Sequence, residues 1–600
     1  MPANRSFFLA LPIISGALLA FACSTNKGAG SSVRPDMPDT GGTGGSGGDQ
    51  PSATAGTSGT ADIIIAPQPD GGDMLGMGDT TPPPTAIPAG GDVLGPGFDM
   101  ANKTKFDAMP TATAAPTVAY PLPHALFPAN LAPVEIHLTK TVATQTIARV
   151  NFHVTGFDLN FYDTCVAAEQ DPNGCVLTIP AAVCKTLGDA NYFGALTTTI
   201  RLADAAGANV GEATLDDVSW TYNRLSGGLY YWTTSSTGVS QTEIRRYNFA
   251  DAGGKPETYW SQNPDSPQLT GSAVPVDQAG PHACMGCHAI SRDGSKIALS
   301  FGGSLPAAFE LIDVATKMPL AQRLDTTTGY ASMTSFSPDN SRLINEFHGK
   351  LLLRSADAML TDVAELFAAD TMEPKSHPFW SPTGDSIAFV SFDFTASATV
   401  PAPTGDLVEN AQIWIAPSDG MTATGPAKVL VPRAAGKSSY YPAISDDGKF
   451  VVFNQSSCTA PMNIGSWGSG PCDGYSDLSA RLMVVPAAGG TPVDLGRANG
   501  EGNLTNSWPR WSPDHGEFNK QQIYWVAFAS RRAYGLRLVG ASDTEPQLWF
   551  AAVRANPGQP LEMDPSFAPV WLPQQNDDMT HPTGNHTPQW VQKIVKIVVK

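Results

Sequence analysis

Three features of the sequence predict an all-β fold in which a β-sandwich precedes a β-propeller, with a disordered tether before both. Short runs of alternating polar and apolar residues begin at about residue 116. A unit of two apolar strands joined by a Ser-containing turn recurs in the second half. Gly, Ser, Thr and Pro runs dominate the first hundred residues. We therefore divide the 600 residues into a signal peptide (1–22), a tether (23–115), a sandwich (116–215) and a propeller (216–600).

The first residues are typical of an export signal. Arg5 precedes the apolar stretch Phe7 to Ala20, which is short for a membrane span. Small residues lead up to Cys23 and resemble the box at which a bacterial lipoprotein is cleaved and acylated. We expect cleavage before Cys23, lipidation of Cys23 and, because Ser24 follows, delivery to the outer membrane on its periplasmic or cell-surface face. The mature chain would then have no transmembrane span; a retained signal-anchor helix is the alternative.

The tether has no apolar periodicity. Its runs include Gly41 to Gly45 and Pro82 to Pro84, and such composition cannot bury enough surface to offset the entropy of the chain. The net charge of −19 is spread along the whole sequence. This charge argues against nucleic acid as a partner.

Strand-like runs separated by turn residues follow the tether. No long run with a helical period interrupts them, so we predict a small sandwich. Nothing in this region resembles a catalytic constellation. The runs are Val134–Leu138, Ala148–Val154, Leu159–Tyr162, Thr197–Leu202 and Asp216–Trp220.

The repeat in the second half predicts the blades of a propeller. In each unit an apolar strand ends in a turn containing Ser, Pro or Asp, and Gly or Asn, and a second apolar strand follows. Several strands per unit at this spacing indicate propeller blades, with six as the count and seven as the alternative. Four clear units are His377–Phe389, Thr334–Ile344, Tyr441–Phe453 and Trp508–Val526.

The end of the chain is expected to close the ring. His586 to Trp590 is similar to the start of the unit at His377, and we expect a strand to continue over Ile594 to Val599. The first blade lacks a first strand, with Gly228 to Trp232 as its second. The last strand would therefore complete the first blade and remove an exposed sheet edge.

The stretch Cys284-Met285-Gly286-Cys287-His288 has the spacing that attaches a c-type haem covalently. Cys284 and Cys287 would each add to a vinyl group of the porphyrin, and His288 would bind the iron. A local disulfide, half a zinc site and chance are the alternatives, but the second Cys/His pair that zinc requires is absent. The motif runs directly into a repeat unit that ends at Leu299. We therefore expect the haem at one mouth of the channel.

The iron needs a sixth ligand or an open position. His586 is our first candidate, because it opens an innermost strand as His288 does. His377 is the second candidate. Met333 and Met285 are weaker ones.

Eight cysteines are present. Besides the lipid and haem residues, Cys458 and Cys472 flank a Gly-rich loop, and we predict that they pair. A further disulfide is expected among three remaining cysteines, either between Cys165 and Cys175 or between Cys175 and Cys184.

The repeat units closely resemble the TolB-type, WD40-like propeller repeat over residues 217–600. With the stretch Cys284 to Ile297 and the terminal Asn585-His586, the arrangement is similar to that of secreted, lipoprotein-like proteins of myxobacteria and related bacteria. This resemblance implies haem binding and export, but no particular reaction.

Three functions follow from these observations. The first is a membrane-anchored cytochrome that passes single electrons to a redox protein or small redox molecule not identified by the sequence. The second is a peroxidase-like or other haem oxidoreductase with an open iron position. The third is a propeller without redox chemistry that binds protein or polysaccharide. No Ser-His-Asp set, phosphate loop or HExxH motif is found, so hydrolases and kinases have little support.

Overall fold

The computed structural model describes residues 81–234, 242–251, 253–261, 285–301, 309–323, 333–395, 403, 408–458, 474–475, 477–538, 545–580 and 582–597. The predicted signal peptide, Cys23 and most of the predicted tether lie outside these ranges. The regular secondary structure of the described residues is almost entirely β-strand, as the sequence predicts. Among them, no helix combines the length and the apolar character that crossing a bilayer requires.

The N-terminal domain packs two sheets around a shared core. Apolar side chains of both sheets, such as Phe152 and Leu177, belong to one buried cluster. A short parallel pair, β3 (Leu126–Pro128) and β10 (Ser219–Thr221), accompanies them. The first sheet has the order β1 (Gly91–Leu94), β6 (Phe157–Thr164), β5 (Gln145–Val154), β8 (Thr197–Asp204) and β9 (Gly211–Leu215), and the second has the order β2 (Thr117–Tyr120), β4 (Val134–Thr139) and β7 (Gly174–Ile179).

The folded part of the chain begins before residue 116. Strand β1 pairs with β6 in parallel, and the 3-10 helix η1 (Met100–Phe106) follows it. Phe98 and Phe106 are buried against Tyr162. The predicted tether boundary at 115 is therefore too late. The apolar residues that hold this stretch are isolated from one another, so they leave no periodic pattern in the sequence.

One α-helix was not expected in this domain. Helix α1 (Ala181–Asn191) buries Val183, Cys184 and Leu187 in the core. Gly188 lies where the helix approaches β10, because a Cβ there would lie 2.6 Å from the carbonyl oxygen of Thr221. That glycine permits close packing but also weakens the helical signal in the sequence.

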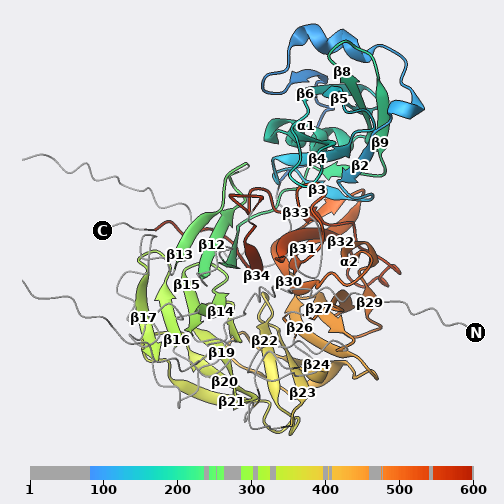
Figure 1. Ribbon diagram of the computed structural model, residues 1–600. Helices are drawn as coiled ribbons and strands as arrows, with labels where there is room; N and C mark the ends of the chain where they lie inside the picture. The colour runs from blue at the N-terminus through green and yellow to red at the C-terminus, as the bar shows by residue number, and fades with distance from the viewer. Residues whose placement is uncertain are drawn as a thin grey trace, which may run out of the picture. The chain divides into compact units, whose positions relative to one another are not determined.

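The second half folds into consecutive four-stranded antiparallel sheets, which Figure 1 shows following one another around a common centre. Six such sheets are present in the described ranges, in line with the six-blade prediction; the blade number of the whole chain stays a prediction. We number them blades 1 to 6. From the innermost strand outward, blade 1 contains β34 (Gly584–Val591), β11 (Gly228–Thr234), β12 (Thr242–Asn248) and β13 (Glu257–Ser261), and blade 2 contains β14 (Met285–Ile290), β15 (Lys296–Phe301), β16 (Phe309–Asp313) and β17 (Met318–Arg323). Blade 3 contains β18 (Thr334–Phe336), β19 (Arg342–Phe347), β20 (Lys350–Ser355) and β21 (Asp362–Leu366), and blade 4 contains β22 (Lys375–Trp380), β23 (Ser386–Asp393), β24 (Glu409–Pro417) and β25 (Lys428–Val431). Blade 5 contains β26 (Ser438–Ile444), β27 (Phe450–Ser456), β28 (Arg481–Pro486) and β29 (Val493–Asp494), and blade 6 contains β30 (Ser507–Phe518), β31 (Gln521–Ser530), β32 (Gln547–Arg554) and β33 (Val570–Trp571). A one-turn helix, α2 (Gly496–Asn499), follows β29.

The recurring turn explains why the repeat is visible in the sequence. In blade 2, the Ser291 hydroxyl donates to Asp293 Oδ1 and accepts from the backbone N–H of Lys296, each at 2.8 Å. Gly294 then adopts a φ of 74°, which glycine tolerates without cost. Ser445 and Asp447 make the same hydrogen bond in blade 5. Each residue type in the turn therefore has a structural role, which is why the pattern recurs.

The C-terminal strand completes blade 1, as predicted. Strand β34 pairs antiparallel with β11, with Gly228 opposite Val591. The strand ends at Val591, so the further strand expected at Ile594 to Val599 is wrong over 594–597, and 598–600 lie outside the described residues. Gly227, with a φ of 68°, sits where a Cβ would lie 1.9 Å from the carbonyl oxygen of Val591.

The N-terminal domain and blade 6 share core and polar contacts. Arg537 forms a two-pronged ion pair with Glu135, at 2.8 and 2.9 Å, and the Tyr534 hydroxyl donates to the same carboxylate at 2.9 Å. The Tyr120 hydroxyl accepts from the backbone N–H of Trp571 at 3.1 Å. These contacts bury a charged pair between the two halves of the chain.

Candidate functional site

The CxxCH motif lies at the start of the innermost strand of blade 2, as the sequence predicts. Strand β14 begins at Met285, and His288 pairs with Leu299 of β15. Cys284 lies outside the described residues, and of Cys287 only the backbone is described. His288 is therefore the member of the motif whose surroundings can be analysed.

His288 is a buried imidazole whose ring nitrogens lack a partner at hydrogen-bond distance and angle among the described residues. Its residue is 1% exposed. Burial lowers its pKa to about 3; the nearby backbone of Tyr230 opposes this shift, and the charge of Arg510 adds to it. The ring is therefore neutral, with an unshared nitrogen lone pair. Buried polar groups are rarely left unsatisfied, so the His288 nitrogens are available to a ligand or to an ordered water.

His586 lies on the neighbouring innermost strand, since β34 packs beside β14. It is 4% exposed, and its Nδ1 has no partner among the described residues. Its ring stacks on Tyr475, with centroids 4.3 Å apart, and lies 6.2 Å from the ring of Trp232. Burial, with the charge of Arg531, holds its pKa well below the usual value. His288 and His586 therefore share burial, neutrality and an unsatisfied nitrogen.

His377 is engaged by the protein itself. Its Nδ1 accepts a hydrogen bond from the backbone N–H of Tyr441 at 3.3 Å, and the two rings are 4.3 Å apart. A neutral imidazole that accepts at Nδ1 carries its proton at Nε2. That nitrogen then has no lone pair for a metal. His586, in contrast, has an Nδ1 without a partner among the described residues.

The innermost strands share a bulge, and it corrects the alignment of the two histidines. His377, Tyr441, Trp508 and Thr587 have φ values of 50°, 53°, 55° and 47°. Thr587, and not His586, thus holds the place of His377, so the two histidines are one residue apart in register. The sequence comparison matched histidine with histidine, whereas the backbone aligns the residues around the bulge.

The bulge positions of blades 4, 5 and 6 form an aromatic layer. The rings of His377 and Tyr441, and those of Tyr441 and Trp508, have centroids 4.3 Å apart. Each of these residues lies four positions before the Ser of its turn, as does Cys287 in blade 2. Met333, the equivalent residue of blade 3, packs in the same cluster as Tyr441 and Trp508. Cys287 of the CxxCH motif therefore holds the same strand position as the large buried side chains of this layer.

Arg510 and Tyr475 are residues of this region that sequence reasoning missed. Arg510 lies in the innermost strand of blade 6, with its guanidinium 5.0 Å from the ring of Trp508 and 5.5 Å from that of Phe379. The sequence signal that could have identified Arg510 is a single arginine between two tryptophans in a predicted strand. Tyr475 follows an irregular Gly-rich segment and lacks any periodic signal.

The structure decides between the two disulfides considered for Cys165, Cys175 and Cys184. Cys165 and Cys175 form a disulfide, and Cys184 is a free, buried thiol. Cys458 is disulfide-bonded, but its predicted partner Cys472 lies outside the described residues, so that pairing stays a prediction. Within the described ranges, no group of three or more His, Cys, Asp or Glu side chains is placed to hold a metal ion.

Six four-stranded sheets, closed by the C-terminal strand, define this class of protein as a β-propeller with an additional N-terminal β-domain. No family model and no curated protein matches the sequence. Several solved structures are similar at low identity. TolB from Agrobacterium tumefaciens is 11% identical with a TM-score of 0.30, over 60% of this chain and 98% of that chain.

Two further solved structures are similar at the same level. The dihydro-heme d1 dehydrogenase NirN is 12% identical with a TM-score of 0.29, over 57% of this chain and 63% of that chain. Hydrazine synthase from Kuenenia stuttgartiensis is 12% identical with a TM-score of 0.28, over 55% and 93%. Likenesses at this level carry no argument about the site.

Proposed function

We propose that this chain is an extracytoplasmic, lipid-anchored β-propeller that holds one covalent haem c and passes single electrons. The observation that carries the proposal is His288, next to Cys287 in the CxxCH motif: its imidazole is buried, and neither ring nitrogen meets a partner at hydrogen-bond distance and angle among the described residues. Cys284 and Cys287 would hold the porphyrin and His288 would bind the iron. Neutral imidazole is the form of histidine that binds metals.

The residues around His288 suit a ligand with a fixed orientation. Strand β14 is held by its ladder to β15, so the His288 backbone cannot swing away from its place. His586 is the second residue that would bind the iron in our proposal, and its stacking on Tyr475 restricts rotation of the ring. When bound, haem supplies a one-electron couple whose potential depends on its ligands and its burial.

The same burial favours electron transfer. Trp232, Tyr475 and Ile290 lie in one apolar cluster beside the two histidines. Such surroundings exclude water, and a site that excludes water reorganises little when its charge changes. The partner would be a redox protein or a small redox molecule. Lipidation at Cys23 would keep the propeller at the outer membrane.

The test is a haem stain and an absorption spectrum of the chain exported by cells that mature c-type cytochromes. We expect a coloured protein that keeps its haem on a denaturing gel and shows a low-spin spectrum. Cys287→Ser should weaken covalent retention, and His288→Ala should abolish the low-spin spectrum. Replacement of the surface residue His124 by Ala is the matched control and should change neither.

Colourless protein from cells in which another CxxCH protein matures would overturn the proposal. Haem that leaves the denatured chain would overturn the covalent part. A high-spin spectrum that responds to carbon monoxide would instead indicate an open iron position and a haem oxidoreductase.

A further inference from the structure

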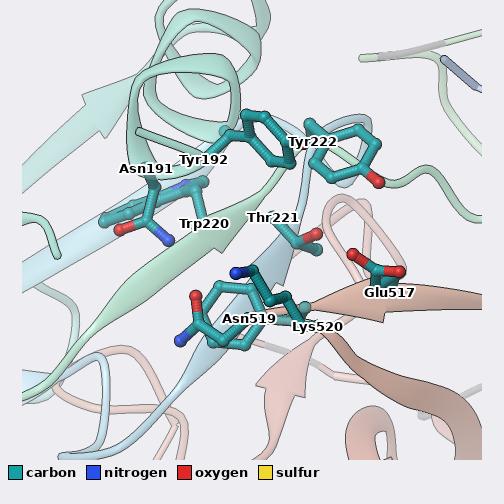
Figure 2. Close-up of a pocket in the computed structure, with 10 residues that line it drawn as sticks. Asn191, Tyr192, Trp220, Thr221, Tyr222, Glu517, Asn519 and Lys520 are labelled. Atoms are coloured by element: carbon teal, nitrogen blue, oxygen red, sulfur yellow. The ribbon is translucent and has the colours of Figure 1, made fainter. Parts of the chain in front are cut away.

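A cavity of about 380 Å³ lies where the N-terminal domain meets blade 6 (Figure 2). One wall is the end of helix α1 with strand β10 and the residue after it. The other wall is the turn that joins β30 to β31. This volume falls in the range of small-molecule sites.

The side chain of Asn223 holds the hairpin wall close to the N-terminal domain. A Cβ at Gly516 would lie 2.7 Å from the Asn223 side chain, whose Oδ1 accepts from the backbone N–H of Glu517 at 2.8 Å. The turn residues Asn519 and Lys520 both have a positive φ, 51° and 64°, as a two-residue hairpin requires. The hairpin side of the cavity is therefore built into the fold.

Three polar groups of the cavity lining have no partner among the described residues. Asn191 is 5% exposed, and its Oδ1 accepts from the backbone N–H of Leu196 at 3.0 Å. Its Nδ2 has no partner in the described ranges and points toward the hairpin in Figure 2. Neither the Glu517 carboxylate nor the Lys520 ammonium has a hydrogen bond or ion pair within those ranges. The cavity therefore offers a buried donor, an acceptor and a cationic donor.

Aromatic surface completes the lining. The ring of Tyr192 is edge-on to that of Tyr222 at 5.2 Å, and the side chain of Trp220 is buried behind them. Tyr192 is 46% exposed although it is a large aromatic residue. An exposed, rigid aromatic face beside polar groups is the usual composition of a recognition surface.

We propose that this cavity binds a saccharide. One carboxylate and one ammonium cancel, so the lining does not select an anion or a cation. Vicinal hydroxyl groups both donate and accept hydrogen bonds, which matches the Asn191 amide, Glu517 and Lys520. The apolar C–H face of a pyranose ring packs on an aromatic ring such as Tyr192. The site lies in the N-terminal domain and blade 6 and is independent of the haem proposal.

The experiment is ligand-observed saturation-transfer NMR on the full chain, with maltohexaose, cellohexaose, chitohexaose and xylohexaose as probes. We expect at least one probe to bind. Tyr192→Ala should weaken that binding at least tenfold, and Glu517→Gln should weaken it several-fold. Both side chains are exposed, so neither change threatens folding.

Phe193→Ala is the matched control. Phe193 is the next residue, is 42% exposed and does not line the cavity, so its removal should change the affinity less than twofold. The proposal is wrong if no probe binds, or if Phe193→Ala and Tyr192→Ala weaken binding equally.

Discussion

The ring of His586 lies on the ring of Tyr475, with centroids 4.3 Å apart and planes inclined by 22°. The two residues come from different blades, since His586 is in β34 of blade 1 and Tyr475 precedes β28 of blade 5. A side chain from the segment before β28 of blade 5 thus restricts the orientation of the proposed sixth ligand. Stacked rings of this kind contribute about 1 kcal/mol beyond the burial of their surface.

We predict that His586→Ala converts the haem protein from low spin to high spin. Removal of the second imidazole leaves the iron with His288 alone, and added imidazole should restore the low-spin absorption spectrum. His377→Ala is the control, because the Nδ1 of His377 accepts from Tyr441 and its ring is not a ligand in our proposal. Spectra that do not differ between His586→Ala and wild type would remove His586 from the site.

We predict that Gly227→Ala destabilises the protein far more than Gly436→Ala. Both glycines have a positive φ, 68° and 66°, so both substitutions carry a backbone cost of about 1 kcal/mol. Only at Gly227 does the new Cβ meet backbone, the carbonyl oxygen of Val591; at Gly436 nothing lies within 4 Å. The extra cost at Gly227 should be about 2 kcal/mol or more.

Thermal unfolding followed by circular dichroism measures the difference between the two glycine variants. Equal melting temperatures would show that the pairing of β11 with the closing strand is not under steric constraint at its end.

We predict that Arg537→Ala lowers the free energy of unfolding by about 3 kcal/mol, because it leaves the Glu135 carboxylate in a buried place with fewer partners. Lys350→Ala, which breaks the exposed pair with Glu365, should cost about 0.5 kcal/mol or less. Denaturant titration of both variants provides the comparison. A loss no larger for Arg537→Ala than for Lys350→Ala would contradict a structural role for the ion pair.

We predict that one contribution to stability is lost as the pH rises above 6.5. Burial lowers the pKa of His515, but its hydrogen bond to Asp446 at 2.7 Å and the nearby carboxylates of Asp447 and Asp514 outweigh burial and raise it. A group whose pKa is raised by folding stabilises the fold fully below its unfolded value and loses that contribution as the pH passes its folded value.

The measurement for His515 is the denaturation midpoint at pH 5.5 and pH 8.5, in wild type and in His515→Gln. The advantage of wild type over the variant should be larger at pH 5.5. An advantage that grows toward high pH would contradict the assignment.

The blades could be predicted from the sequence because their turns are chemically specific. Ser291, Asp293 and Gly294 each satisfy a separate requirement of the turn, so equivalent residues recur in other blades. The closing strand was predictable for the same reason, since His586 to Trp590 repeats the start of a blade. The register of His586 was not predictable, because a bulge shifts the strand by one residue and leaves no signal in the residue types.

The elements that the sequence analysis missed are held in place by isolated contacts, which leave no periodic pattern in the sequence. Strand β1 adds to the edge of a sheet through its backbone, and backbone hydrogen bonds leave no trace in residue type. Helix α1 is short, and its glycine serves packing against β10. Tyr475 acts from a loop, and the cavity next to Tyr192 arises where residues distant in the chain meet.

Blade 1 is assembled from strands that lie far apart in the sequence, so β11 is synthesised long before its partner β34. The free side of β11 is one of the first parts of the ring to be synthesised, yet its partner β34 is among the last. Until β34 arrives, β11 presents unpaired backbone groups that another chain could capture. The β11 edge is therefore open to mispairing with another chain until β34 pairs with it.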